Sequence, residues 1–321
     1  MKYEVPDDVT PETGQQRSAF LQAVIEGLAK RPASIPAKFF YDSMGSDLFE
    51  RICETPEYYL SRTEQEILQR NLCEIAEYFT DETLIIEPGA GSAIKVRPLI
   101  EAVQPKAYIP IDIAEQQLLQ GTAELANLFP SLRIHPHCGD FNDDFAIPKQ
   151  LNNASRLFFF PGSTIGNFEP ADTVNFLNKV YRLIAPGGAL LIGIDLIKDP
   201  ARLNAAYNDA GGLTARFNLN LLARMQRELG AELQIEDFSH YAIFNPEKKR
   251  VEMFLISQCN QTIRIGDKKF EFAHGEPIHT ENSYKYDRSA FETLVKNIGF
   301  SVRHSLTDAE QLFGVYLLTP R

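Results

Sequence analysis

The sequence predicts an α/β protein with a mostly parallel sheet, a terminal antiparallel strand pair and a second, smaller α+β domain. Three features predict this fold. Short apolar runs alternate with amphipathic stretches from residue 83 to 196, two strand-like runs close the chain with no helix between them, and residues 1–60 and 197–285 follow neither pattern. Alternating strands and helices imply right-handed crossovers and a parallel sheet covered on both faces.

The expected sheet is made of apolar runs that are typical of short, largely buried strands. These runs are TLIIE (83–87), AYIPID (107–112), LRIHPHCGD (132–140), RLFFFPG (156–162) and ALLIGIDL (189–196). Apolar residues at three- and four-residue steps predict the helices between them, over AIKVRPLIEAVQ, AEQQLLQGTAELANLF and ADTVNFLNKVYRLIA. The PGG at 186–188 ends the last of these helices.

The end of the chain predicts an antiparallel addition to the sheet edge. A helix is expected over RSAFETLVKNIG, followed by strands over FSVRHSLTD and LFGVYLLTP. Two strand-like runs joined by a short acidic connection, without a helix, are typical of an antiparallel pair.

The remaining stretches predict a second domain. One contains a helix near QRSAFLQAVIEGLAK, and the other holds two helices followed by strands over HYAIFNP, RVEMFLIS, QTIRI and KKFEFA. Each stretch is too short to form a complete domain, so we expect the two to pack together. The expected domains are therefore 61–196 with 286–321, and 1–60 with 197–285.

The composition argues against nucleic acid or an anionic membrane as a partner. Lys and Arg total 32 against 43 Asp and Glu, a net charge of −11, and such an acidic surface repels both polyanions. The N-terminus MKYEVPDDVT lacks a basic region followed by an apolar run, and ALLIGIDLI is short and broken by Asp195. We therefore expect neither a signal peptide nor a membrane span.

The cysteines and histidines predict no disulfide framework and no metal. Cys53, Cys73, Cys138 and Cys259 form no CxxC pair, which favours a reducing, cytoplasmic compartment. His135, His137 and Cys138 stand too close in one apparent strand to converge on one ion.

The turn EPGAGS, after the first strand, is a candidate ligand-binding element. The strand ends in Glu87, and Gly89 and Gly91 permit backbone torsions that other residues resist and let a ligand approach closely. The third glycine of a GxGxxG pattern is missing, which disfavours a pyrophosphate cradle.

The next two strand ends add acidic and aromatic groups. Asp112 closes the second strand, where adenosine-binding sheets place a carboxylate against ribose hydroxyls, and Asp140 and Phe141 follow the third. A carboxylate accepts from the adenine amino group, and a ring packs on the base. Because such sheets bind ligands at their carboxyl ends, the three strand ends together predict an S-adenosylmethionine site. The alternatives are an ordinary glycine turn and a helix-capping aspartate.

The sequence resembles the histidine-specific Nα-methyltransferases of ergothioneine biosynthesis, which trimethylate the α-amino group of L-histidine with S-adenosylmethionine. The resemblance covers nearly the entire chain and is carried by KFFYDSMGSDLFERICETPEYYLSRTEQEIL, GSTIGNFEP, DLIKD, AYNDAGGLTARFN, RVEMFLIS and TENSYKY. It implies a Rossmann-like class I methyltransferase sheet that binds the cofactor, a second domain that binds the substrate, and an enzyme expected to be a monomer acting on a small molecule.

The resemblance also implies roles for single residues. With the glycine turn, the expected cofactor-binding residues are Tyr58, Glu87, Gly89, Gly91, Lys95, Asp112, Asp140 and Phe141. The residues expected to hold the substrate are Asn167 and Tyr207 at its carboxylate, Glu281 and Ser283 at its imidazole, and Phe49 and Met253 packed around it. Tyr41, Gly162 and Asn167 are the expected catalytic residues, which orient the amine.

Physical reasoning supports some of these roles and leaves alternatives for others. Glu281 and Ser283, spaced i and i+2, project to the same side of an extended segment and can meet the two ring nitrogens of an imidazole. The alternatives are a solvated Glu281, Met253 as a strand core residue and Lys95 as an exposed helical cation. Ser61 and Glu64 also match a capping box, beneath which Tyr58 would pack.

Three other functions are considered. An Nα-methyltransferase of another amino acid, such as tryptophan, is disfavoured by Glu281, because a carboxylate is a poor neighbour for an indole face. A nicotinamide-dependent oxidoreductase is disfavoured by the incomplete glycine pattern and the terminal strand pair. A non-catalytic S-adenosylmethionine sensor would have no need for an amino-acid pocket.

Overall fold

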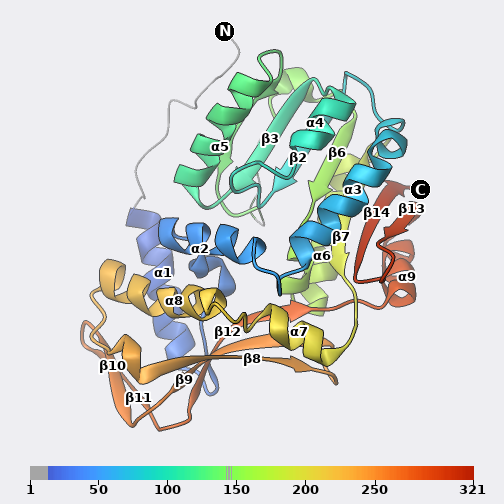
Figure 1. Ribbon diagram of the computed structural model, residues 1–321. Coiled ribbons are helices and arrows are strands. Elements are labelled where there is room, and N and C mark those ends of the chain that lie inside the picture. The colour runs from blue at the N-terminus through green and yellow to red at the C-terminus, as the bar shows by residue number, and fades with distance from the viewer. Residues whose placement is uncertain (1–13, 142, 144, 146) are drawn as a thin grey trace. The chain divides into compact units, whose positions relative to one another are not determined.

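The structure is a computed structural model that describes residues 14–141, 143, 145 and 147–321 (Figure 1). Contacts divide the described chain into two compact units. Unit 1 comprises Leu60–Ile197 and Lys285–Arg321, and unit 2 comprises residues 14–59 and Lys198–Tyr284. The predicted absence of a signal peptide concerns residues 1–10, which lie outside the described residues.

Unit 1 is built on one sheet with the strand order β13-β14-β7-β6-β2-β3-β4, and β5 also pairs with β3. The strands are β2 (Leu84–Pro88), β3 (Ala107–Asp112), β4 (Arg133–Ile134), β5 (His137–Cys138), β6 (Arg156–Phe160), β7 (Ala189–Asp195), β13 (Phe300–Thr307) and β14 (Phe313–Pro320). Strands β2 to β7 pair in parallel, whereas β14 is antiparallel to both β7 and β13. The predicted fold class, including the terminal antiparallel pair, is confirmed.

The prediction of one strand over 132–140 is wrong. Two short strands, β4 and β5, stand there, with His135 and Pro136 between them. Proline has no N–H to donate to a ladder, so the pairing with β3 is interrupted at that point.

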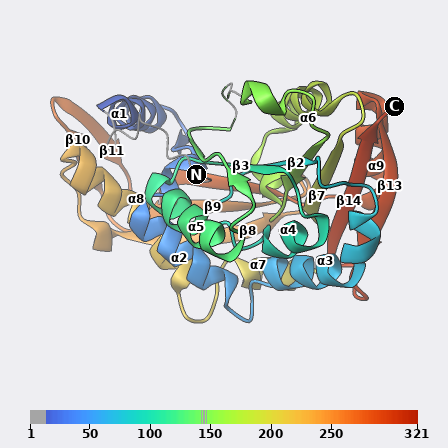
Figure 2. The same cartoon turned by 90° about the horizontal axis from the view of Figure 1, so that it is seen from above.

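Helices cover both faces of the sheet, with α3, α4 and α5 on one side and α6 and α9 on the other (Figure 2). They are α3 (Leu60–Ala76), α4 (Arg97–Val103), α5 (Glu115–Leu128), α6 (Pro170–Ile184) and α9 (Arg288–Ile298), with short 3-10 turns η2 (Lys149–Leu151) and η3 (Thr164–Asn167). The core between α6, α9 and the strands includes the fully buried Leu177, Phe291 and Val295. Helix α4 begins later than predicted, because Ala93 has a left-handed φ of 53°.

Unit 2 contains a sheet with the order β1-β12-β9-β8 and a separate β10-β11 hairpin. Its strands are β1 (Ala33–Ser34), β8 (Phe238–Asn245), β9 (Arg250–Ser257), β10 (Gln261–Ile265), β11 (Lys268–Phe272) and β12 (Pro277–Tyr284). Its helices are α1 (Gly14–Leu28), α2 (Ser43–Cys53), α7 (Pro200–Ala206) and α8 (Leu213–Leu229), with 3-10 turns η1 (Ala37–Phe40) and η4 (Ile235–Asp237). Strand β12 has no counterpart among the predicted strands.

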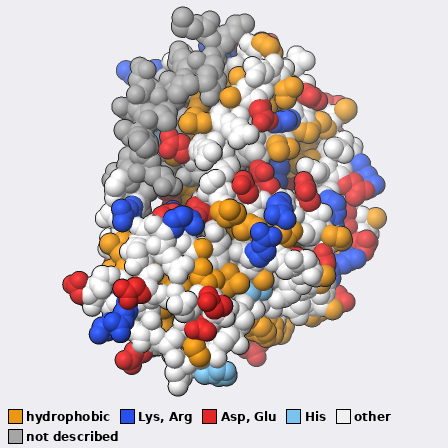
Figure 3. All heavy atoms as spheres, turned by 60° about the vertical axis from the view of Figure 1, so that its left-hand side comes forward, with side chains coloured by type: hydrophobic (Ala, Val, Ile, Leu, Met, Phe, Trp, Pro, Cys, Tyr) orange, Lys and Arg blue, Asp and Glu red, His pale blue; other side chains and the backbone are white. Residues whose placement is uncertain are grey.

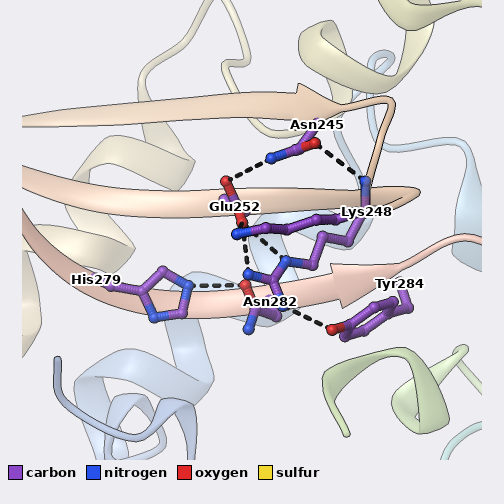
Figure 4. A network of polar contacts seen from close by, with 7 residues as sticks. Asn245, Lys248, Glu252, His279, Asn282 and Tyr284 are labelled. Carbon is purple, nitrogen blue, oxygen red and sulfur yellow. Dashed lines mark hydrogen bonds and ion pairs between the residues drawn. The ribbon is translucent and has the colours of Figure 1, made fainter. Parts of the chain in front are cut away.

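The two faces of the unit 2 sheet differ. Helix α8 packs against β8 and β9 on one face, and its Leu221 and Met225 are fully buried. On the other face, polar side chains of β9 and β12 form a hydrogen-bonded network that includes Glu252 and Asn282 (Figure 4). Adjacent residues in a strand point to opposite faces, so Met253, next to Glu252, and Glu281, next to Asn282, point toward the α8 side.

The surface carries charges of both signs. Figure 3 shows acidic and basic side chains interspersed on one face of the molecule. Within the described residues, no helix combines the length and the apolar character needed to cross a membrane.

Candidate functional site

The glycine turn after β2 adopts the backbone conformation that its sequence predicts. Gly89 and Gly91 have φ values of 70° and 50°, and a Cβ at either position would meet no atom within 4 Å. Left-handed torsion, rather than lack of space, is therefore what favours glycine here. The Gly89 N–H donates to the carbonyl of Ile111 at 2.7 Å, which ties the turn to the end of β3.

Close packing against α5 completes the turn. A Cβ on Gly121 of α5 would lie 2.3 Å from the carbonyl oxygen of Ser92. The glycine that allows a helix to approach the turn thus lies on the helix after β3, not in the third position of a GxGxxG pattern. The backbone from Gly89 to Ser92 is thus held by the end of β3 on one side and by α5 on the other.

Asp112, at the end of β3, holds the same turn through its carboxylate. Its Oδ2 accepts the Gly91 N–H and its Oδ1 accepts the Ala114 N–H, both at 2.8 Å. Burial raises the pKa of Asp112, and these backbone N–H groups lower it in part. Each carboxylate oxygen has a second lone pair, so the side chain can fix the turn and still accept a hydrogen bond from a ribose hydroxyl.

Glu87 is a buried carboxyl at the end of β2. It accepts a hydrogen bond from the Tyr108 hydroxyl. Burial raises the pKa of Glu87 to about 8; the Tyr108 hydroxyl and Lys95 act against this shift, whereas Asp112 and Glu64 add to it. Glu87, Asp112 and Glu64 thus lie around the turn with a single lysine, Lys95. A ligand that carries positive charge, as S-adenosylmethionine does at its sulfonium, would favour the ionised form of these carboxyl groups.

Glu64 is a buried acid beside Gly162 and Lys95, so its predicted place in a helix cap is wrong. Helix α3 begins at Leu60, so Ser61 lies inside the helix and no capping box forms. The buried Glu64 carboxylate accepts the Gly162 N–H at 2.9 and 2.8 Å and lies 3.8 Å from Lys95 Nζ. A Cβ on Gly193 would lie 2.0 Å from Glu64 Oε1, so glycine in β7 makes room for this side chain.

The helical spacing of α3 could have identified Glu64 as a buried residue. It lies on the buried face of the helix with Leu60, Thr63 and Ile67, and an acid among such positions is unusual. Burial raises the pKa of Glu64, whereas Lys95 and the Gly162 N–H lower it. Lys95 precedes α4 and is half-buried, so the alternative of an exposed helical cation is wrong.

The segment 162–167 follows β6 and contains two predicted catalytic residues. Gly162 and Ser163 have φ values of 77° and 57°. The Ser163 hydroxyl accepts the Asp195 N–H at 2.8 Å, and Asp195 pairs with Lys285 at 2.9 Å with both side chains fully buried. Asn167 ends η3, is half-buried, and has no side-chain hydrogen bond to any other described residue. Its amide is thus available to a ligand.

Asp140 and Phe141 follow β5, and both are half-buried. The Phe141 ring lies 5.9 to 6.1 Å from the rings of Phe160, Phe168 and Phe176, at the margin of the core. The assignment of these residues to the adenine stays a prediction.

In unit 2, β9 and β12 bring together three predicted substrate-binding residues. Glu281 is paired in register with Met253, and Ser283 with Val251. Glu281, Ser283 and Met253 are all buried, so the alternative of a solvated Glu281 is wrong. The Tyr207 hydroxyl, from the end of α7, donates to Ser283 Oγ at 2.8 Å. A carboxylate and two hydroxyls thus lie on the buried side of β12.

An aromatic group lies in the same unit and contains the other predicted residues. The Phe49 ring is 5.7 Å from that of Tyr41 and 6.1 Å from that of Tyr58, and Tyr58 is 6.2 Å from Tyr207. Burial raises the pKa of Tyr58, and the neighbouring Tyr207 adds to the shift. Tyr58, predicted to bind the cofactor, thus packs among residues predicted to bind the substrate.

The predicted site residues therefore form two sets. Unit 1 holds Glu87, Gly89, Gly91, Lys95, Asp112, Asp140, Phe141, Gly162 and Asn167. Unit 2 holds Tyr41, Phe49, Tyr58, Tyr207, Met253, Glu281 and Ser283.

Comparison with known proteins identifies the family. A family model described as "Histidine-specific methyltransferase, SAM-dependent" matches residues 20–320. The chain is 38% identical over 305 residues to the histidine N-alpha-methyltransferase of Mycolicibacterium smegmatis, and 37% identical over 306 residues to that of Mycobacterium tuberculosis, each alignment covering 93% of this chain and 94% of the relative. Ergothioneine biosynthesis protein 1 of Neurospora crassa is 29% identical over 297 residues, covering 89% of this chain and 33% of that protein. The chain therefore belongs to the histidine-specific, S-adenosylmethionine-dependent methyltransferases.

Proposed function

We propose that the chain transfers methyl groups from S-adenosylmethionine to the α-amino group of L-histidine and forms Nα,Nα,Nα-trimethylhistidine (hercynine) in ergothioneine biosynthesis. Family membership supports the cofactor and histidine, and the names of the two mycobacterial relatives support the α-nitrogen. The name of the Neurospora crassa relative supports the pathway. The observation that carries the proposal is the buried pair of Glu281 and Ser283 on β12, joined to Tyr207.

The two units take different parts in this proposal. Unit 1 binds the cofactor at the glycine turn, with Asp112 at the ribose and the Asp140–Phe141 segment at the base. Unit 2 binds the imidazole through Glu281 and Ser283, which can accept from one ring nitrogen and donate to the other. Asn167 of unit 1 and Tyr207 of unit 2 are assigned to the substrate carboxylate, because their amide and hydroxyl groups donate hydrogen bonds without a full charge. The Tyr207 hydroxyl has one proton, so this proton would turn from Ser283 Oγ to the carboxylate when the substrate binds.

The proposed chemistry needs alignment more than acid–base assistance. S-adenosylmethionine supplies a methyl group on a sulfonium, and the neutral α-amine takes it in a direct displacement. Because no net charge is created, this chain contributes chiefly by orienting the amine lone pair and excluding water. The Gly162 carbonyl, the Asn167 amide and the Tyr41 hydroxyl are assigned to that orientation.

The aromatic group of unit 2 suits the product. Two of the three transfers release a proton to water or a weak base, and the third leaves a quaternary ammonium that forms no hydrogen bond. Aromatic faces attract such a cation. Tyr41, Phe49, Tyr58 and Tyr207 form a connected set of rings and supply such faces.

Mass spectrometry tests the proposed function directly. L-histidine incubated with the purified chain and S-adenosylmethionine should gain three methyl groups, and fragmentation should locate all of them on the α-nitrogen. Methyl groups on the imidazole would overturn the proposed position of transfer. An unchanged histidine beside a methylated tryptophan would overturn the substrate.

Two further expectations complete the proposal. A reducing, cytoplasmic compartment is expected from the spacing of the four cysteines. A monomer is also expected, and light scattering on the purified chain would measure its mass in solution.

A further inference from the structure

A closed ring of hydrogen bonds joins Tyr207 to β12 at two points. The Tyr207 hydroxyl donates to Ser283 Oγ at 2.8 Å, and its backbone carbonyl lies 2.9 Å from His240 Nε2. His240 Nδ1 lies 2.9 Å from the amide nitrogen of Asn218, and Thr280 donates to the amide oxygen of Asn218 at 2.9 Å. Because Thr280 and Ser283 both belong to β12, the ring closes through the strand. We call these five residues the β12 frame.

The frame holds a β-bulge on which the placement of Glu281 depends. His279 pairs with Phe254 and Glu281 with Met253, so Thr280 is an extra residue in β12. His279 Nε2 reaches Asn282 Oδ1 at 2.8 Å on the outer face (Figure 4). Residues three apart in a regular strand point to opposite faces. The bond between His279 and Asn282 places both side chains on one face, which is possible because the bulge shifts the alternation by one residue. Without the bulge, Glu281 would share its face with His279 and point away from α8.

Asn218 of α8 is the member that connects the elements. Its side chain is fully buried, its oxygen accepts from Thr280, and its nitrogen donates to His240 and to the Phe254 carbonyl at 3.0 Å. All of its hydrogen-bonding groups are thus used. Thr280 also reaches the Met253 carbonyl at 3.2 Å, which fixes the bulge to β9.

The frame also fixes the form of His240. Because the Asn218 nitrogen donates, His240 Nδ1 is the acceptor and Nε2–H donates to the Tyr207 carbonyl. Burial lowers the pKa of His240, which favours this neutral form. The hydrogen bonds of the β12 frame require a neutral imidazole with one donor nitrogen and one acceptor nitrogen.

We propose that Thr280, Asn218 and His240 are positioning residues that fix the spacing between Tyr207 and the Glu281–Ser283 pair and thereby set the affinity for histidine. This inference rests on the proposed function, in which Tyr207 meets the carboxylate and Glu281 the imidazole. None of the three needs to touch the substrate. Loosening the frame should weaken histidine binding and leave the cofactor site of unit 1 unchanged.

The first test is Thr280→Val, which keeps the branched shape and removes the hydroxyl. The loss of a buried hydrogen bond should raise the KM for histidine about tenfold, while kcat changes less than about threefold. The dissociation constant of S-adenosylhomocysteine, measured by titration calorimetry, should not change. Thr280→Ser should restore the KM, because it returns the hydroxyl. Thr262→Val on β10 makes the same chemical change outside the frame and should behave as wild type.

His240→Phe is a second test, which can be used if Thr280→Val does not fold. His240 is only half-buried, and His240→Phe removes both of its bonds to the frame. It should raise the KM for histidine in the same way. Either variant, folded and with an unchanged KM, would overturn the proposal, as would an equal loss in Thr280→Val and Thr280→Ser.

The wild-type chain offers a check without any substitution. Nitrogen chemical shifts of the His240 ring should report a proton on Nε2 and none on Nδ1 at neutral pH. The opposite tautomer would contradict the ring of bonds. Failure of the proposed function is a separate result, because it would show as wild-type chain that does not methylate histidine at all.

Discussion

The glycine turn of unit 1 and the buried face of β12 in unit 2 are built by different means. The turn is mostly backbone: two glycines with left-handed torsions, N–H groups bound by Asp112, and a helix held close at Gly121. The β12 face is made of side chains whose direction depends on a bulge and on bonds to Asn218 and Tyr207. In the proposed function, the backbone-built turn holds the adenosyl group of the cofactor, whereas the placed side chains of β12 select the amino acid.

The largest effect that would test this contrast is expected at Asp112. Asp112→Asn replaces one acceptor oxygen by an amide, so that a backbone N–H of the turn loses its partner. Losing a charged hydrogen-bond acceptor should weaken S-adenosylhomocysteine binding about 100-fold, measured by titration calorimetry. Asp81→Asn, at an exposed position before β2, is the matched control. Equal affinities in the two variants would mean that Asp112 does not hold the cofactor.

The next effect is expected on β12. Glu281→Gln removes the charge that is proposed to face the imidazole, and kcat/KM for histidine should fall about 30-fold, because hydrogen bonds to charged groups contribute most. The affinity for S-adenosylhomocysteine should stay the same, which separates the two regions. Asn282→Ala is the control, since this neighbour points to the opposite face. A comparable loss in the control would contradict the assigned faces.

The two regions also differ in how far the sequence predicts them. The strands and helices of unit 1, the glycine turn and Asp112 follow from local patterns, because each strand end meets its helix within a few residues. Strand β12 has no such pattern. Its polar residues alternate around a bulge, and the bond that holds it joins Thr280 to Asn218 across 62 positions. Only the family resemblance pointed to Glu281, while Asn218 and His240 were not predicted at all.

Glu64 illustrates the same limit inside unit 1. The local pattern of Ser61 and Glu64 predicted a helix cap, whereas the actual partner, Gly162, lies 98 positions away. A local pattern cannot report such a contact. The tertiary position of β7, where Gly193 leaves space, decides where the carboxylate goes.

A smaller effect should show whether Glu64 serves both ligands. Glu64→Gln keeps an oxygen for the Gly162 N–H and removes the charge beside Lys95, so kcat/KM should fall about tenfold for either substrate when the other is saturating. The exposed Glu66→Gln, which loses only its pair with Arg70, should match wild type. A loss for one substrate alone would assign Glu64 to that ligand.

The smallest effect concerns stability and pH. Burial raises the pKa of Glu87 to about 8, from the ordinary value of 4.5 for a glutamate side chain. A raised pKa in the folded state means that the protonated carboxyl stabilises unit 1 fully below about pH 4.5, and that this contribution is lost as the pH rises toward 8. Glu87→Gln stays neutral at every pH. Its Tm minus that of wild type should therefore increase between pH 5 and 8.5, by roughly 2 to 4 °C for each kcal/mol of this contribution that the wild type loses. Scanning calorimetry would measure this difference, and Glu82→Gln, at an exposed position before β2, is the control. A difference that stays flat with pH would mean that Glu87 is ionised throughout, and that the edge of the sheet is more strongly negative than the contrast with β12 assumes.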